Sequence, residues 1–322
     1  MLEKVDLTKK ISKEEYKAKM PQMEIELGRL QRECRELKIP VMIVFEGFGA
    51  SGKGVQIGKL IQSMDPRGFQ VFPIKAETED ERMHPFLWRF WTKTPEAGRI
   101  AIFDGSWYRK VLIDRFEKRT REKEIETAFH SIEAFEKQLT DGGTILVKLL
   151  LDIDQKEQKK RFEKLLEKKE TAWRVSQGDR ERNAKYSEYA AMMEEVLYRS
   201  DTKSAPWTVI EATDRRFATV KIYMTVIHAL AEAVEAVQRR RMEEQAIKAA
   251  EQVSGQQEAA EIMRQAGGEL EMLQSSVLSR ADLTLAYGKE EYEKRLKKLQ
   301  KKIEKLHGEV YRRRIPVVIG FE

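Results

Sequence analysis

A glycine-rich loop lies between a short apolar run and an amphipathic stretch near the start of this chain, an arrangement that few folds accommodate. The apolar residues 41–45 lead into the loop 46–54, which has the Walker A spacing G-x-x-x-x-G-K. Glycines let successive backbone N–H groups turn toward a phosphate, and the start of the following helix adds its dipole. We therefore expect phosphate to bind at Gly47, Gly52, Lys53 and Gly54. The alternative is an ordinary glycine-rich turn.

Apolar runs of strand length alternate with long amphipathic stretches through the first 240 residues. The predicted strands are residues 41–45, 70–74, 99–103, 144–151 and 208–211. The main predicted helices are residues 125–139, 155–168, 180–199 and 217–239. Such alternation indicates a parallel sheet with helices on both faces. The chain is therefore predicted to adopt an α/β fold of three layers.

An acidic residue, Asp104, directly follows the third predicted strand. Ligands bind beyond the carboxyl ends of parallel strands, so this carboxylate should face the same crevice as Lys53. We expect both residues to be catalytic, with Asp104 holding Mg²⁺ beside the phosphates. A helix N-cap is the alternative role for Asp104. Gly54 stands where a common loop of this type has Ser or Thr, so the hydroxyl that would ligate Mg²⁺ is absent.

A basic segment around the predicted loop 169–178 is interpreted as a mobile lid. Phosphoryl-transfer enzymes close such segments over the phosphates, which brings cations to them and excludes water. A charged helix is more often a solvated face, and acidic residues interleave with the basic ones here. Only Arg161, Arg174 and Arg180 are therefore kept as candidate residues of the lid. We expect Arg174 and Arg180 to bind phosphate and Arg174 to act in catalysis.

The chain also contains an internal repeat. Residues 5–46 align without a gap with residues 281–322, with 15 identities in 42 positions. The match begins at Asp6-Leu7-Thr8 and Asp282-Leu283-Thr284 and continues through a helix and a strand, which argues against chance similarity between two charged helices. In the first copy the glycine-rich loop follows at once, whereas the second copy stops at Glu322. We therefore expect one full domain and the opening of a second.

Four segments follow from this pattern. They are an N-terminal helical segment at 1–38, a domain at 39–240, a helical linker at 241–280 and a truncated second repeat at 281–322. The linker is rich in Ala, Glu and Gln and has no proline. A last pair of domain helices is the alternative interpretation of this segment.

The composition excludes several classes of protein. The net charge of +6 favours an anionic partner. No run of 18 apolar residues and no signal peptide occurs, so we expect no membrane span. The single cysteine, Cys34, cannot form an internal disulfide, and the four histidines show no metal-ligand spacing. We therefore place the protein in the cytoplasm. Nucleic acid ranks low as a partner, since no helix-turn-helix, zinc or base-stacking motif is present.

Several motifs in order resemble those of the polyphosphate kinase 2 family. They include FEGFGASGKG at residues 45–54, LWRFW at 87–91, FDGSWY at 103–108 and WRVS at 173–176. The resemblance covers about residues 37–230. It implies a P-loop kinase fold related to thymidylate kinases, with a helical lid. It also implies Mg²⁺-dependent phosphoryl transfer between inorganic polyphosphate and an adenine or guanine nucleotide.

The duplication is similar to the two-domain branch of that family, which resembles polyphosphate:AMP phosphotransferases that make ADP from AMP. Polyphosphate would then lie along basic residues of the lid and the crevice. Lys53, Asp104 and Arg174 match family positions, and Lys110 stands where the family has a second arginine after the Walker B acid. The resemblance thus adds Lys110 to the phosphate-binding set.

Two positions depart from the family pattern. Gly49 stands where the family usually has a metal-binding Asp, and Gly105 where it usually has Arg. We therefore expect the double variant Gly49→Asp/Gly105→Arg to raise Mg²⁺-dependent transfer.

Three functions remain open at this point. This copy is a catalytic phosphotransferase, a degenerate partner domain that holds polyphosphate without transferring it, or a nucleoside monophosphate kinase that uses ATP. Either a homo-oligomer or packing against a second homologous domain is expected.

Overall fold

The computed structural model of the chain describes residues 2–262 and 286–319. It divides into two units, Met1–Met242 and Glu243–Glu322. Residues 263–280 of the predicted linker lie outside the described residues, as do Asp282-Leu283-Thr284 and Glu322 of the second repeat. The two units are described separately below.

The first unit contains a five-stranded parallel sheet. Its strands are β1 (Val41–Gly47), β2 (Phe69–Pro73), β3 (Ile100–Asp104), β4 (Ile145–Asp152) and β5 (Trp207–Glu211). Their order is β2-β3-β1-β4-β5, so β1 lies in the centre between β3 and β4. Every residue of β1 is buried, as expected for a central strand covered on both faces. The predicted α/β fold with a parallel sheet is confirmed, and each strand lies within two residues of its predicted bounds.

The helices and short 3-10 turns fill the connections between the strands. The helices before β4 are α1 (Lys13–Glu36), α2 (Lys53–Ile61), α3 (Trp88–Trp91), α4 (Ile113–Phe116) and α5 (Glu122–Asp141). Those after β4 are α6 (Gln155–Leu166), α7 (Lys169–Ala172), α8 (Gln177–Ala184), α9 (Tyr186–Ser200) and α10 (Arg215–Ile262). The 3-10 turns are η1 (Leu2–Lys4), η2 (Pro66–Gly68), η3 (Glu81–Met83) and η4 (Trp107–Lys110). The single helix predicted at 180–199 is wrong, because the chain breaks at Lys185 between α8 and α9.

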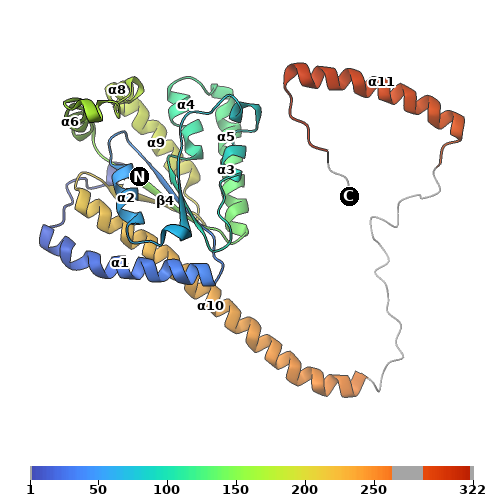
Figure 1. Ribbon diagram of the computed structural model, residues 1–322, viewed down its shortest axis with the longest axis horizontal. Helices are drawn as coiled ribbons and strands as arrows, with labels where there is room; N and C mark the ends of the chain where they lie inside the picture. The colour runs from blue at the N-terminus through green and yellow to red at the C-terminus, as the bar shows by residue number, and fades with distance from the viewer. Residues whose placement is uncertain (1, 263–285, 320–322) are drawn as a thin grey trace. The chain divides into compact units, whose positions relative to one another are not determined.

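Helices cover the sheet in two layers (Figure 1). On one face, α2 and α10 are joined where the Tyr223 hydroxyl donates to the carbonyl of Lys59 over 2.7 Å. The α1 side chain Gln31 bonds the backbone at Asp65, just after α2. On the other face, the guanidinium of Arg199 in α9 lies 3.9 Å from the ring centre of Phe129 in α5. The glycine-rich loop therefore sits at the carboxyl edge of a sheet that is fixed from both sides.

One stretch of α10, Arg215–Ile247, is long and apolar enough to cross a membrane by length and composition. Half of its most apolar window is buried inside the fold, and the core helix of a globular domain meets the same criterion. This stretch alone therefore does not indicate a membrane protein.

The second unit carries the helix of the second repeat copy, α11 (Lys289–Arg313). It begins at the residue that aligns with Lys13, the first residue of α1. Its apolar residues Leu299, Ile303 and Leu306 are exposed, whereas the aligned α1 residues are packed into the core of the first unit. The same helical pattern is thus buried in one copy and uncovered in the other.

We expect Leu27→Ala to lower the free energy of unfolding by about 2–5 kcal/mol, because Leu27 is fully buried in α1. The matched variant is Ile303→Ala at the aligned position in α11, where the side chain is 65% exposed. This change should cost less than about 0.5 kcal/mol. Urea unfolding followed by tryptophan fluorescence measures both, since all five tryptophans lie in the first unit. Equal losses in the two variants would contradict the burial of α1.

Candidate functional site

The glycine-rich loop has a backbone that side chains would disrupt. Gly47 has a φ of +137°, and a Cβ there would lie 2.3 Å from the carbonyl oxygen of Leu151 in β4. Gly52 has a φ of +105° directly before the first residue of α2. The Nζ of Lys53 donates to the carbonyls of Gly47, over 3.0 Å, and Phe48, over 3.3 Å. The lysine therefore lies folded over its own loop, which is where a bound phosphate would meet it.

A cavity of about 830 Å³ opens at this loop. Five of the predicted site residues line it together, namely Gly52, Lys53, Gly54, Asp104 and Arg174. Its remaining lining residues are Ala50, Val55, Arg161, Lys164, Leu165, Lys168, Thr171, Trp173 and Arg215. Cations thus outnumber the single carboxylate by six to one. Such a cavity attracts a polyanion.

Arg161 in α6 bonds to the backbone of the glycine-rich loop, and these bonds occupy its guanidinium. Its guanidinium donates to the carbonyls of Ala50 and Ser51 in the loop and of Ala212 and Thr213 after β5, over 2.8–3.1 Å. Its Nε also donates to Glu157 over 2.7 Å. This role was missed, because the four carbonyls belong to residues about 50 or 110 positions away.

Glu46 is a second residue that the sequence analysis missed. It lies at the end of β1 and is buried, and burial raises the pKa of its carboxyl group above the ordinary value. The hydroxyl of Ser106 donates to its Oε1 over 2.8 Å. Its place directly before Gly47 was the available signal. The contact ties the start of the glycine-rich loop to the segment that follows Asp104.

The remaining predicted residues lie elsewhere. Gly47 belongs to the loop but does not line the large cavity. Lys110 lines a separate cavity of about 440 Å³ together with Arg82, Asp114 and Arg119. Arg180 is exposed on α8 and lines neither cavity.

The inward-facing arginine of α8 is Arg182. Its guanidinium bonds the carboxylates of Glu117 and Asp179. The predicted lid loop also contains a short helix, α7, that the sequence analysis did not expect.

The expectation for Gly49 and Gly105 needs correction. A Cβ at Gly49 would lie 3.0 Å from Oδ1 of Asp179 and 3.1 Å from the ring of Phe162, and Gly49 does not line the large cavity. An Asp here would therefore start against another carboxylate rather than in the cavity. Gly105 has a φ of +74°, a conformation that strains an arginine. Both changes meet obstacles that the sequence did not reveal.

The residues present fit a Mg²⁺ ion that is bound mainly through its substrate. Among residues 2–262 and 286–319 no cluster of three or more His, Cys, Asp or Glu could hold a metal by itself. Mg²⁺ commonly uses one or two carboxylates together with substrate phosphates and water. A Cβ built on Gly54 would lie 3.9 Å from Oδ2 of Asp104, so this carboxylate reaches the start of α2. Asp104 could thus supply the protein's oxygen ligand.

The sequence model of polyphosphate kinase 2 matches residues 10–240. The chain belongs to the polyphosphate kinase 2 family. It is 36% identical over 233 residues to a polyphosphate:AMP phosphotransferase of Pseudomonas syringae pv. tomato, covering 72% of this chain and 47% of that protein. The chain spans about half the length of the curated polyphosphate:AMP phosphotransferases that it matches.

Two solved structures of polyphosphate kinase 2 proteins share the fold. A putative member from Pseudomonas aeruginosa PA01 superposes with a TM-score of 0.70 at 35% identity, covering 73% of this chain and 51% of that one. One from Arthrobacter aurescens TC1 gives a TM-score of 0.68 at 30% identity, covering 72% of this chain and 85% of that one. The resemblance to the polyphosphate kinase 2 family is therefore confirmed, together with its P-loop kinase fold.

Asp152, the last residue of β4, makes the free energy of unfolding depend on pH. Burial, with the negative charges of Asp154 and Glu211, raises the pKa of Asp152 from 3.8 to about 6. The folded protein thus binds this proton more tightly than the unfolded chain. Stability is therefore lost as the pH rises from about 4 to about 6.

Asp152→Asn should remove this loss. We expect the variant to gain up to about 3 kcal/mol relative to the wild type between pH 4 and pH 7. Urea unfolding of both proteins across this range measures the difference. A constant difference across the range would contradict the raised pKa of Asp152.

Gly49→Asp should lower the free energy of unfolding by about 1–3 kcal/mol, because the new side chain crowds Phe162 and Asp179. Gly49→Asn has nearly the same volume without the charge, so the difference between the two variants isolates repulsion from Asp179. Urea unfolding and titration calorimetry with Mg²⁺ and tripolyphosphate are the measurements. A Mg²⁺ affinity above that of the wild type would restore the original expectation.

Proposed function

We propose that the first unit transfers a phosphoryl group between inorganic polyphosphate and a nucleotide. The observation that carries this proposal is the cavity in which Lys53, Asp104 and Arg174 meet at the carboxyl edge of the sheet. Phosphoryl transfer needs positioning and charge stabilisation rather than a nucleophilic side chain. The names of relatives from Pseudomonas support polyphosphate and AMP as the substrate pair.

Polyphosphate binds in the large cavity under this proposal. Lys53 leaves its own loop carbonyls and contacts the phosphate nearest the backbone N–H groups. Phosphates farther along the polyphosphate chain bind to Arg174, Lys164, Lys168 and Arg215. Asp104 holds Mg²⁺, which when bound would neutralise charge on the transferred phosphoryl group.

The nucleotide binds in the smaller cavity beside η4. Lys110, Arg82 and Arg119 line this cavity and offer cations to the phosphate of the nucleotide. Asp114 partly balances them, since it pairs with Arg119 over 2.8 Å. Arg180 remains a candidate for phosphate contact only if the lid segment moves when the substrates bind.

A second candidate is a copy that binds polyphosphate without transferring it. The glycine at position 54 favours it, since this residue lines the cavity and offers no side-chain ligand for the metal. In this case the first unit would supply polyphosphate to a second homologous domain. The helix α11 of the second unit repeats the sequence pattern of α1. ATP as the phosphoryl donor is the third possibility.

Lys53→Ala should lower the transfer rate at least about 100-fold, because the variant loses a preorganised cation on the transferred charge. The measurement is nucleotide formation from polyphosphate and Mg²⁺ with AMP, ADP or GDP as acceptor. Lys59→Ala is the control, since Lys59 lies on the exposed side of the same helix.

Three outcomes separate the candidates. Product well above that of Lys53→Ala supports transfer. Polyphosphate retention without product supports the binding-only copy. A preference for ATP over polyphosphate as donor selects the nucleoside monophosphate kinase.

A further inference from the structure

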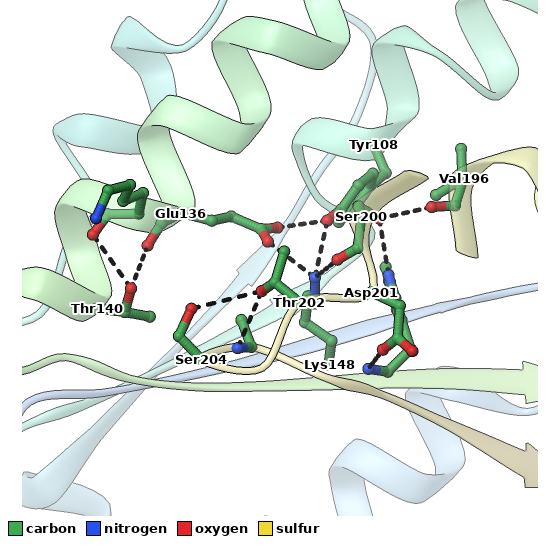
Figure 2. Close-up of polar contacts among 12 residues, drawn as sticks. Tyr108, Glu136, Thr140, Lys148, Val196, Ser200, Asp201, Thr202 and Ser204 are labelled. Atoms are coloured by element: carbon green, nitrogen blue, oxygen red, sulfur yellow. Dashed lines mark hydrogen bonds and ion pairs between the residues drawn. The ribbon is translucent and has the colours of Figure 1, made fainter. Parts of the chain in front are cut away.

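A buried ion pair lies between β4 and α5 (Figure 2). Lys148 in β4 is fully buried, and its Nζ lies 2.8 Å from Oε2 of Glu136 in α5. The same Nζ donates to the carbonyl of Ser200 over 2.6 Å and to the hydroxyl of Tyr108 over 3.2 Å. The ammonium group of this buried lysine therefore has three polar partners, Glu136, Tyr108 and Ser200.

Glu136 uses its other oxygen to hold η4. Its Oε1 accepts from Nε1 of Trp107 over 2.9 Å and from the hydroxyl of Tyr108 over 2.5 Å. Both donors are buried, as is the acceptor. An ionised carboxylate only accepts hydrogen bonds, so it can serve two donors and a lysine at the same time. Lys148 donates to the second oxygen of Glu136, so the first oxygen is left to the two donors of η4.

The held residues follow the candidate metal ligand closely. Trp107 and Tyr108 come three and four residues after Asp104 and begin the turn that ends at Lys110. On the other side of the same segment, Ser106 donates to Glu46 at the start of the glycine-rich loop. Two buried carboxylates from different elements thus grip the segment between the two cavities.

We propose that Glu136 and Lys148 are positioning residues that fix η4, and through it Asp104 and Lys110, toward the two cavities. The proposal rests on the phosphoryl-transfer function proposed above. Neither residue lines a cavity that holds the candidate site residues. Their effect is therefore carried by Trp107 and Tyr108.

The alternative is a purely structural ion pair. A buried ion pair often contributes little more to stability than apolar residues of similar volume. Two double variants use this property. Glu136→Leu/Lys148→Met removes both charges and the acceptor for η4, whereas Glu136→Gln/Lys148→Met removes both charges but keeps an acceptor oxygen.

The first measurement is hydrogen exchange of the backbone amides of residues 105–110 in the full chain. The second is the affinity for tripolyphosphate with and without Mg²⁺, by titration calorimetry. Glu136→Leu/Lys148→Met should exchange faster in this segment and lose about tenfold or more of the Mg²⁺-dependent affinity. Glu136→Gln/Lys148→Met should remain close to the wild type in both measurements.

Ser200→Ala is the matched control. It removes buried hydrogen bonds to Trp207 and Val196 and a side-chain contact with the Tyr108 hydroxyl, while the bonds of Trp107 and Tyr108 to Glu136 stay in place. It should reduce stability while leaving both measurements unchanged. Tyr108→Phe removes one donor to Glu136 and replaces Glu136→Leu/Lys148→Met if that variant does not fold.

Wild-type exchange and affinity in Glu136→Leu/Lys148→Met or, in its place, in Tyr108→Phe would overturn the proposal. An equal loss in Ser200→Ala would also overturn it, because the effect would then follow stability alone. A wild-type protein that binds no tripolyphosphate would contradict the proposed function instead. The exchange rates would still decide whether Glu136 and Lys148 fix η4.

Discussion

The candidate site depends on the hydrogen bonds that the guanidinium of Arg161 donates. The guanidinium donates to carbonyl oxygens of the glycine-rich loop and of the segment after β5, and so joins both segments to α6. Because these carbonyls accept hydrogen bonds from Arg161, the backbone of the loop is held against α6. Gln158 adds a further bond from the same helix to the carbonyl of Gly49. The proposed phosphate site, which is made largely of main chain, therefore relies on one buried side chain.

The site is otherwise distributed over elements that meet only in the folded protein. Lys53 comes from the start of α2, Asp104 from the end of β3 and Arg174 from the segment between α7 and α8. Parallel pairing of β1 with β3, in which Phe45 lies opposite Asp104, brings the first two together. The sheet order thus decides which residues can share a phosphate chain.

Local patterns were sufficient to predict the sheet, the glycine-rich loop and the family. The apolar runs predicted every strand to within two residues. The signal is clearest for β1, β3 and β4, which lie inside the sheet and are almost wholly buried. The segment at 180–199 was predicted as one helix, since its charged residues give no local sign of the break at Lys185. The exposure of Arg180 and the inward direction of Arg182 depend on packing, which spacing does not reveal.

Long-range polar pairs were the main part of the site that the sequence could not provide. Glu46 meets Ser106 over 60 residues, and Lys148 meets Glu136 across a sheet–helix interface. Lys148 interrupts an apolar run in the sequence, but the residues of that run do not predict that Glu136 is its partner. Gly49 looked like a lost ligand, yet its missing side chain would meet Asp179.

The pair of Lys148 and Glu136 also restricts the order in which this sequence can change. Removing one partner of a buried ion pair costs about 3–5 kcal/mol, whereas replacing both by apolar residues is often neutral. A lineage that exchanges the pair one residue at a time would therefore pass through an intermediate with an orphaned charge. Substitutions at the two positions should therefore be tolerated together more readily than singly.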